Sequence, residues 1–311
     1  MIRVISRFQH MEETFKFNRQ GARRDSVWRR LMGIGLLMAA IGWGAPVFAQ
    51  KSADDLLKNA QAAFERGQAR EALKLVRQAV EVDPANTQAL YFSGRLRESL
   101  HEYTGAIEDF GAMLKLQPGA ANVYQLRGAA HFKAGQISES IADFDKEIEL
   151  VPGRAPHHWQ RGISYYYAKE YEKGRRQFED HRAVNPNDVE NAVWHFLCVV
   201  PISGVAKARE VLIPVSGDTR VPMKQIHDLF AGKGSVEAVL DAAREGDSGG
   251  RVDRLFYAHL YLGLYEEALG KDEKCREHLL KAVRDFPTAH YMGDVARVHA
   301  KLRGYAVTES P

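Results

Sequence analysis

Residues 128–152 read GAAHFKAGQISESIADFDKEIELVP, and the spacing within this stretch recurs along much of the chain. The stretch ends on one of four prolines that follow one another every 34 residues: Pro84, Pro118, Pro152 and Pro186. Each proline comes directly after an apolar segment with helical periodicity. A fixed period of this size is typical of one supersecondary unit that is stacked repeatedly. The sequence therefore predicts an array of similar helical units.

The unit has a repeating pattern of small and large residues. With each proline numbered as position 32, position 8 is Ala60, Gly94, Gly128 and Gly162, position 20 is Ala72, Ala106, Ser140 and Gly174, and position 24 is Val76, Phe110, Phe144 and Phe178. Two antiparallel helices approach closely only where one side chain is small, and a larger residue fills the space beside it. At position 15, Gly67 and Gly135 are expected to end the first helix as left-handed caps. The proline ends the second helix, because a steric clash with its ring disfavours helical backbone angles for the residue before it.

This pattern resembles the tetratricopeptide repeat (TPR) family, whose unit is a helix-turn-helix. The resemblance covers four units over residues 53–186. A further unit follows in YLGLYEEALGKDEKCREHLLKAVRDFP, which places Gly263, Gly270, Cys275, Leu279, Ala282 and Pro287 at positions 8, 15, 20, 24, 27 and 32. The resemblance implies an all-α fold, a right-handed TPR superhelix of about four regular repeats, a degenerate middle and a C-terminal repeat with a capping helix.

The expected organisation has five parts: a signal peptide and leader over 1–49, four regular units over 50–186, degenerate helical repeats over 187–250, a C-terminal unit with its capping helix over 251–304, and a disordered tail over 305–311. In the degenerate part we expect helices in 190–200, 204–213, 222–232 and 235–246, with Ser235 as an N-cap. The capping helix, within 290–304, is expected to bury Tyr291, Val295, Val298 and Leu302.

The N-terminal 49 residues favour export. Arg29-Arg30 precede LMGIGLLMAAIGWGAPVFAQ, an apolar segment of signal-peptide length that ends at a small-residue site, so cleavage is expected between Ala49 and Gln50. This predicts a periplasmic or cell-envelope location. An uncleaved membrane anchor, a buried helix of the fold, and a cytosolic protein with a misassigned start remain alternatives. The absence of a cysteine near the cleavage site excludes a lipid anchor there.

Charge gives little support for binding to nucleic acid. The formal net charge is +3, and residues 1–49 supply eight basic and three acidic side chains, or +5, which leaves −2 for the rest. The part of the chain after residue 49 is nearly neutral and has no run of basic residues. It is therefore not expected to bind phosphates as its main role. The two cysteines, Cys198 and Cys275, lie at helical positions and are interpreted as small buried residues rather than as a disulfide.

Residues 157–171, HHWQRGISYYYAKEY, are unusually aromatic. The repeat register assigns His158, Gly162 and Tyr165 to the core, and the TPR resemblance assigns the residues beside them to the concave surface. Taken over all units, the candidate partner-binding residues are Phe64, Tyr91, Arg95, Phe132, Lys133, Trp159, Ile163, Tyr166 and Tyr167. Such a cluster approaches the largest apolar patch that a soluble monomer leaves open. Either a partner peptide or helix covers it, or the 189–250 region or the C-terminal helix of this chain does.

The sequence contains no catalytic motif, and we predict a non-enzymatic protein. The adjacent His157 and His158 diverge by about 100° on a helix, which is poor geometry for a shared metal. No metal, cofactor, small-molecule substrate or nucleic acid is therefore expected. The predicted function is an adaptor that binds a protein or peptide in the concave groove, and a homodimer is left open. The C-terminal third is similar in organisation to envelope TPR lipoproteins of the NlpI type, which implies a link to cell-wall hydrolases or a protease. The alternative is a structural or oligomerisation module with a self-filled groove.

Overall fold

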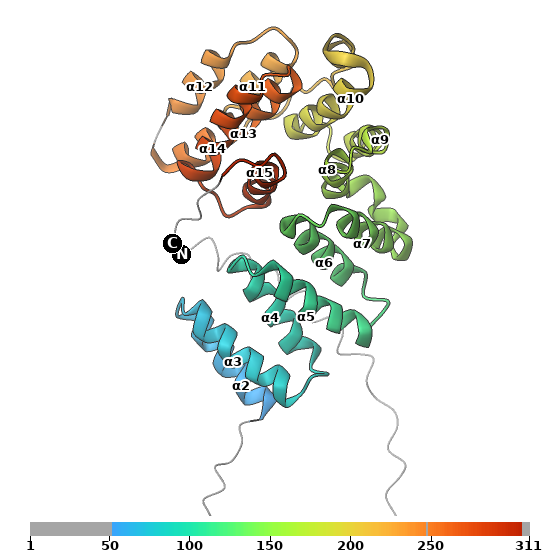
Figure 1. Ribbon diagram of the computed structural model, residues 1–311, viewed down its shortest axis with the longest axis vertical. Helices are drawn as coiled ribbons and strands as arrows, with labels where there is room; N and C mark the ends of the chain where they lie inside the picture. The colour runs from blue at the N-terminus through green and yellow to red at the C-terminus, as the bar shows by residue number, and fades with distance from the viewer. Residues whose placement is uncertain (1–51, 247, 307–311) are drawn as a thin grey trace, which may run out of the picture. The chain divides into compact units, whose positions relative to one another are not determined.

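The computed structural model describes residues 52–246 and 248–306, which form α-helices and short 3-10 helices joined by turns, without a β-strand in this part of the chain (Figure 1). The chain divides into two compact units, one ending at Leu96 and one beginning at Arg97, and each is described by itself. The predicted leader over 1–49 lies outside the described residues, as do residues 307–311 of the predicted tail. The all-α repeat fold expected from the sequence is confirmed.

The N-terminal unit contains the first repeat and most of the next helix. Helices α2 (Ala53–Glu65) and α3 (Ala69–Val82) pack against each other, and α4 (Thr87–Ser99) follows. Ser52 caps α2, because its hydroxyl accepts a hydrogen bond from the Asp55 backbone N–H at 3.1 Å. The predicted packing residues of this repeat are fully buried: Ala60, Ala72 and Val76.

The C-terminal unit continues the repeats with α5 (Tyr103–Leu116), α6 (Ala121–Ala134), α7 (Ile137–Leu150), α8 (Trp159–Tyr167) and α9 (Tyr171–Arg182). Each second helix ends shortly before its proline, as predicted. The fourth repeat differs from the expectation, because the 3-10 helix η1 (Pro152–His157) precedes α8. His157 and His158 therefore lie before the α-helix rather than within its first turn.

The small and large positions fit together as the sequence indicates. A Cβ atom added to Gly162 would lie 2.7 Å from Phe178 Cζ, and one added to Gly128 would lie 2.7 Å from Phe144 Cε1. Real Cβ atoms do not approach so closely. The absence of a side chain at position 8 therefore lets the ring at position 24 lie against the backbone of the partner helix.

The turn between the two helices of a repeat uses a left-handed residue at position 15. Gly67 and Gly135 adopt φ values of 76° and 85°, which confirms them as caps. The second and fourth repeats keep the same conformation without glycine, since His101 and Lys169 both have φ of 61°. The turn geometry of the repeat is therefore retained where the preferred residue is missing.

The degenerate region is helical but irregular. Helix α10 (Val189–Glu210) is broken at Gly204, where φ is 80° and ψ is 167°, so it corresponds to the two consecutive helices expected there. By length and composition α10 is apolar enough to cross a membrane, yet 56% of its apolar window is buried inside the fold. Residues 212–219 contain no helix, and α11 (Met223–Phe230) and α12 (Val236–Arg244) follow. Ser235 caps α12 as predicted, accepting from the Ala238 N–H at 3.1 Å.

The last three helices close the C-terminal unit. The 3-10 helix η2 (Ser248–Gly250) leads into α13 (Arg251–Ala268), which pairs with α14 (Asp272–Arg284), and α15 (Tyr291–Leu302) ends the fold. Figure 1 shows α15 on the inner side of the arc that runs from α6 to α14, and α15 packs against both of those helices. The expected inward face is correct for Val295 and Val298, which are buried, and wrong for Leu302, which is 41% exposed.

Candidate functional site

The side chains predicted to line the concave surface lie in both units of the chain. Phe64, Tyr91 and Arg95 belong to the N-terminal unit, where all three are partly buried and Phe64 meets Phe92 with ring centroids 5.9 Å apart. The remaining six belong to the C-terminal unit: Phe132, Lys133, Trp159, Ile163, Tyr166 and Tyr167. The aromatic cluster of the C-terminal unit belongs to this second group.

Helices α6 and α8 bring the predicted aromatic residues together. On α8, Trp159, Ile163 and Tyr166 are spaced four and three residues apart and so share one side of the helix. The ring of Tyr167 lies 5.2 Å from that of Tyr166 and 5.6 Å from that of Phe132 on α6. The predicted cluster therefore exists as one contiguous aromatic surface.

Helix α15 covers this surface. The ring of Tyr291 stacks on Phe132 with centroids 5.6 Å apart, and it meets Trp159 edge-on at 5.1 Å. Two turns later, the hydroxyl of Tyr167 lies 3.1 Å from Nδ1 of His299. Near the end of α15, Lys301 Nζ donates a hydrogen bond to the backbone carbonyl of Ala134 at 3.2 Å. The helix is thus attached along its whole length.

A group of charges holds the beginning of α15. Lys133 Nζ lies 2.8 Å from Glu98 Oε1 and 3.7 Å from Asp294 Oδ2. The hydroxyl of Tyr103 donates to Asp294 Oδ1 at 2.7 Å, and burial followed by the charge of Asp294 raises the pKa of Tyr103. Lys133, predicted as a polar contact for a partner, is therefore engaged by carboxylates of its own chain.

A second polar group lies at the other end of the cluster. Tyr166 donates to Glu267 Oε2 at 2.9 Å, and Arg303 pairs with the other carboxylate oxygen. Burial raises the pKa of Tyr166 well above its ordinary value. Burial also lowers the pKa of His299 to about 4, so the imidazole is neutral at pH 7. Trp194 of α10 packs on Tyr166 at 5.4 Å between ring centroids.

The sequence left two candidates for what covers these residues, a partner or a segment of this chain, and the structure shows the second. Phe132 and Ile163 are 0% exposed and Tyr166 is 7% exposed, because α15 and α10 pack over them. The arrangement corresponds to the self-filled groove that the sequence left as an alternative. Contact of these residues with a partner protein stays a prediction.

Sequence reasoning missed several residues of the filled groove. Tyr291 was expected to face inward, but Asp294, His299, Glu267 and Arg303 were not assigned to the site. The sequence does indicate that His299 is buried, because Tyr291, Val295 and His299 follow one another at intervals of four residues and so share one face of the helix. The position of His299 on the buried face could therefore have been inferred. Its partners could not, because they lie far away in the sequence.

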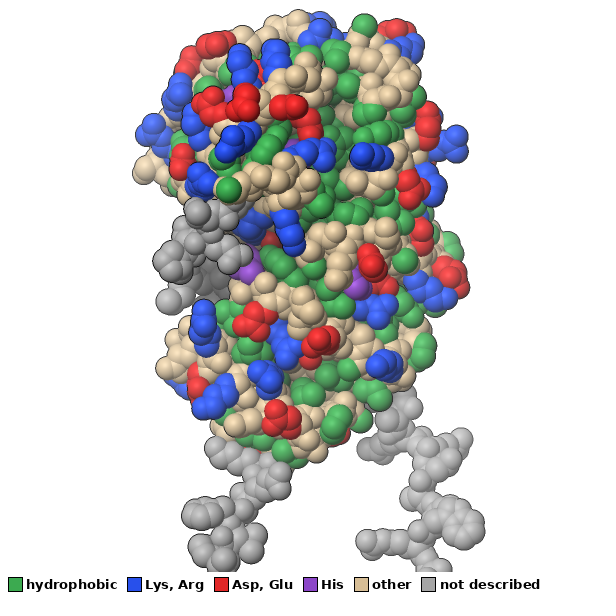
Figure 2. Space-filling model, viewed as in Figure 1, with side chains coloured by type: hydrophobic (Ala, Val, Ile, Leu, Met, Phe, Trp, Pro, Cys, Tyr) green, Lys and Arg blue, Asp and Glu red, His purple; other side chains and the backbone are tan. Residues whose placement is uncertain are grey.

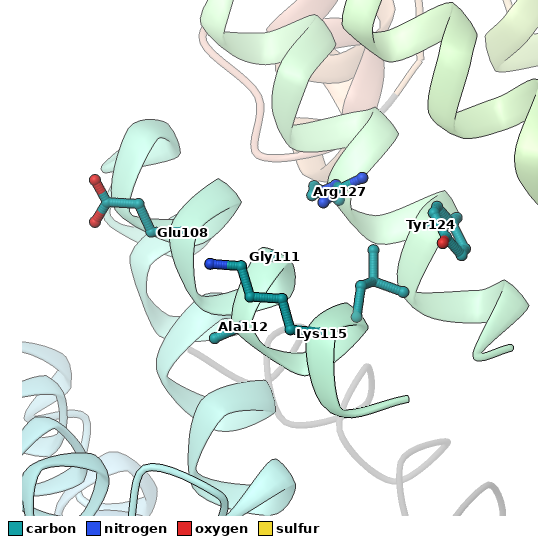
Figure 3. Close-up of a pocket in the computed structure, with 7 residues that line it drawn as sticks. Glu108, Gly111, Ala112, Lys115, Tyr124 and Arg127 are labelled. Atoms are coloured by element: carbon teal, nitrogen blue, oxygen red, sulfur yellow. The ribbon is translucent and has the colours of Figure 1, made fainter. Parts of the chain in front are cut away.

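An open hollow lies elsewhere in the C-terminal unit, between α5 and α6 (Figure 3). It has a volume of about 450 Å³ and is lined by Glu108, Gly111, Ala112, Leu114, Lys115, Tyr124 and Arg127. Arg127 is held by Asp143 through two hydrogen bonds of 2.8 and 2.7 Å. The Arg127 guanidinium is therefore occupied by a structural ion pair. The residues that line the hollow do not form a constellation typical of a catalytic site.

Charge is mixed over the face seen in Figure 2, where acidic and basic side chains lie interspersed. This distribution does not favour a polyanionic ligand. The absence of nucleic-acid binding stays a prediction.

Comparison with protein families matches residues 57–121 and 94–155 to the tetratricopeptide repeat. The regular repeats over these residues are therefore similar to the TPR family. The match includes most of the first three regular repeats and ends before α8 of the fourth. Comparison with curated proteins finds no match. TPR proteins generally mediate protein–protein interactions, and some bind peptides.

Comparison with solved structures finds similar helical repeat proteins. A tetratricopeptide repeat protein from Parabacteroides merdae is 14% identical with a TM-score of 0.52, over 79% of this chain and 98% of that one. MamA from Desulfovibrio magneticus is 21% identical with a TM-score of 0.47, over 51% of this chain and 89% of that one. YrrB, described as a TPR protein with an unusual peptide-binding site, is 15% identical with a TM-score of 0.47, over 62% and 93%.

Proposed function

We propose that this chain is an exported, non-catalytic scaffold that binds a segment of a partner protein in the groove lined by α6 and α8. The TPR fold is typically a non-catalytic scaffold, and its members generally bind other proteins. The position of α15 is the observation that supports this groove as the binding site. The groove accommodates an amphipathic helix, which is a common mode of recognition between proteins.

The contacts of α15 indicate what a competing segment should contain. Tyr291 inserts its ring between Phe132 and Trp159, and Asp294, one turn later, lies near Lys133. Aromatic residues in packed pockets commonly dominate the binding energy of an interface. A partner helix that displaces α15 should therefore offer an aromatic residue followed by an acidic residue one turn later.

Affinity capture from cell-envelope extract tests this proposal with three forms of the full-length protein. The wild type is compared with two variants. Tyr291→Ala removes the aromatic contacts by which α15 packs in the groove, and the double variant Trp159→Ala and Tyr167→Ala removes aromatic side chains of the groove itself. A captured protein is then purified and its affinity for each form is measured by calorimetry. We expect tighter binding to Tyr291→Ala and loss of binding to the double variant. Equal affinity for all three forms would place the interaction outside the groove.

A second candidate function is a structural module whose groove stays closed. The complete burial of Phe132 and Ile163 favours this alternative. In that case the double variant loses stability, and the same set of proteins is captured by all three forms. Sedimentation analysis then decides whether the module forms a homodimer.

Export is a separate part of the proposal and rests on the apolar segment that ends at Ala49. N-terminal sequencing of the mature protein is expected to find Gln50, in the periplasmic or envelope fraction. A protein in the cytosolic fraction whose N-terminus is neither Met1 nor Gln50 would support the misassigned start. The likeness to NlpI-type lipoproteins further suggests cell-wall hydrolases or a protease as partners, and the identity of the captured proteins tests that suggestion.

A further inference from the structure

Three side chains that commonly bind metals meet where α13, α14 and α15 come together. Glu267 lies at the end of α13, Cys275 in the first turn of α14, and His299 on α15. His299 Nε2 is 3.5 Å from Glu267 Oε1 and 3.9 Å from Cys275 Sγ, and all three ligand atoms lie within 4.8 Å of one another. Neither Cys275 nor His299 is exposed to solvent.

These separations are close to those of a zinc site. Tetrahedral zinc with one oxygen, one nitrogen and one sulfur ligand places pairs of ligand atoms about 3.3 to 3.6 Å apart. The contact of His299 with Glu267, at 3.5 Å, lies within this range, and its contact with Cys275, at 3.9 Å, exceeds it by only a few tenths of an ångström. Small rotations of the Glu267 and Cys275 side chains would bring all three atoms onto one ion.

The imidazole of His299 is oriented as a metal ligand should be. Its Nδ1 lies 3.1 Å from the Tyr167 hydroxyl, which leaves Nε2 directed at Glu267 and Cys275. Glu267 is also positioned by a neighbour, because its Oε2 accepts a hydrogen bond from Tyr166 at 2.9 Å. Hydrogen bonds of this kind fix the orientation of metal ligands in proteins and strengthen their binding.

Two further groups face the cluster and must be accommodated. Arg303 pairs with Glu267 Oε1, and the hydroxyl of Tyr305 lies 3.6 Å from Cys275 Sγ. The Arg303 side chain is 36% exposed and follows the end of α15, so it can turn toward solvent when a cation takes its place. The fourth coordination position is then open to water, as in zinc sites with three protein ligands.

We infer that Glu267, Cys275 and His299 form a binding site for a zinc-like divalent cation. Binding replaces the thiol proton of Cys275 by the metal and releases that proton to solvent, with no change of oxidation state. Because the three ligands come from three helices, the bound ion would fasten α15 to α13 and α14. The inference does not depend on the proposed binding of a partner.

Cobalt titration of the untagged, full-length protein under anaerobic, reducing conditions tests the site. Co²⁺ bound by a thiolate gives a sulfur-to-cobalt charge-transfer band in the near ultraviolet, which surface histidines cannot produce. We expect this band to saturate at one equivalent and to disappear when Zn²⁺ is added. We also expect Zn²⁺ to raise the Tm of the protein.

Three variants make the test specific. Cys275→Ala should abolish the band, and alanine is the residue found at the same repeat position in Ala72 and Ala106, so the helix packing is kept. Cys198→Ala is the matched control, because Cys198 is equally buried but belongs to α10, and its band should be unchanged. Glu267→Gln should weaken cobalt binding by at least about tenfold. A wild-type protein without the band, or a band that survives Cys275→Ala, would overturn the inference.

Discussion

Tyr291 of the last helix stacks on Phe132 of the third repeat, with ring centroids 5.6 Å apart and ring planes inclined by 23°. The same Tyr291 ring meets Trp159 of the fourth repeat edge-on at 5.1 Å. One side chain thereby joins the C-terminal helix to two successive repeats. Aromatic pairs of this kind add to the stability gained from burial alone.

Substitution of Tyr291 should measure how firmly α15 is held. Tyr291→Ala is expected to lower the free energy of unfolding by about 3 kcal/mol, because a buried aromatic ring is replaced by a cavity. Tyr291→Phe keeps the ring and should cost less than about 1.5 kcal/mol. Urea denaturation followed by circular dichroism gives both values. A Tyr291→Ala variant as stable as the wild type would show that the stack does not hold α15.

Two glycine substitutions should have opposite effects on stability. A Cβ at Gly162 would lie 2.7 Å from Phe178 Cζ, so Gly162→Ala is expected to destabilise the fold by about 1 to 3 kcal/mol. At Gly111, within α5, the nearest neighbour of the new Cβ is Arg127 Nη1 at 3.7 Å. Gly111→Ala should therefore stabilise the fold by up to about 1 kcal/mol through helix propensity.

Thermal unfolding of the two glycine variants under identical conditions compares them directly. Because both replace a helical glycine by alanine, the change in helix propensity is matched and the difference reports the packing at position 8. Gly162→Ala with the same Tm as Gly111→Ala would mean that Phe178 moves away at no cost. The role assigned to the small residues of the repeat would then be incorrect.

The local rules of the repeat could be predicted from the sequence, since they join residues close together in the chain. Gly162 and Phe178 are sixteen residues apart and recur in register with their counterparts, so their contact follows from the period. The same applies to the cap at Gly135 and the N-cap at Ser235. Helix ends and packing faces of this kind depend on short-range geometry.

The filling of the groove could not be decided from the sequence in the same way. Tyr291 and Phe132 lie far apart in the chain, and both an external partner and α15 satisfy the need to bury the aromatic rings. The charges around Lys133 and the cluster of Glu267, Cys275 and His299 depend on the same long-range packing. Periodicity predicts which side of a helix is buried, but it does not identify the surface that covers it.

The residue at position 15 of the fourth repeat should be replaceable with a gain in stability. Lys169 is exposed and has φ of 61°, a conformation that costs an L-amino acid about 1 kcal/mol and glycine almost nothing. Lys169→Gly is thus expected to raise the free energy of unfolding by about 0.5 to 1 kcal/mol. Arg176→Gly, at an exposed position inside α9, is the control and should lower it by about 1 kcal/mol. If both variants lose stability alike, the turn at Lys169 is not strained.

Stability should decrease as the pH falls below neutrality, because burial lowers the pKa values of four histidines: His195, His259, His278 and His299. Burial lowers the pKa of His299 to about 4, and burial together with the neighbouring His278 lowers the pKa of His259 to about 4. An unfolded histidine has a pKa of about 6.5, so the unfolded chain binds more protons over this interval. The free energy of unfolding therefore rises with pH between these values and is fully developed above about pH 6.5.

The size of the effect can be measured between pH 6.5 and 5, above the ordinary pKa range of exposed carboxylates. Over this interval His259 and His299 should each remove about 1 to 2 kcal/mol from the free energy of unfolding. His299→Gln removes one of the titrating groups, so its stability should fall less steeply with decreasing pH than that of the wild type. His157→Gln, at an exposed position, is the control and should keep the wild-type slope. The measurements are made by urea denaturation in the presence of a chelator, so that no bound metal contributes. Identical slopes for His299→Gln and the wild type would mean that His299 is protonated in the folded protein without cost. Its contact with Tyr167 and its complete burial on the inner face of α15 argue against that outcome.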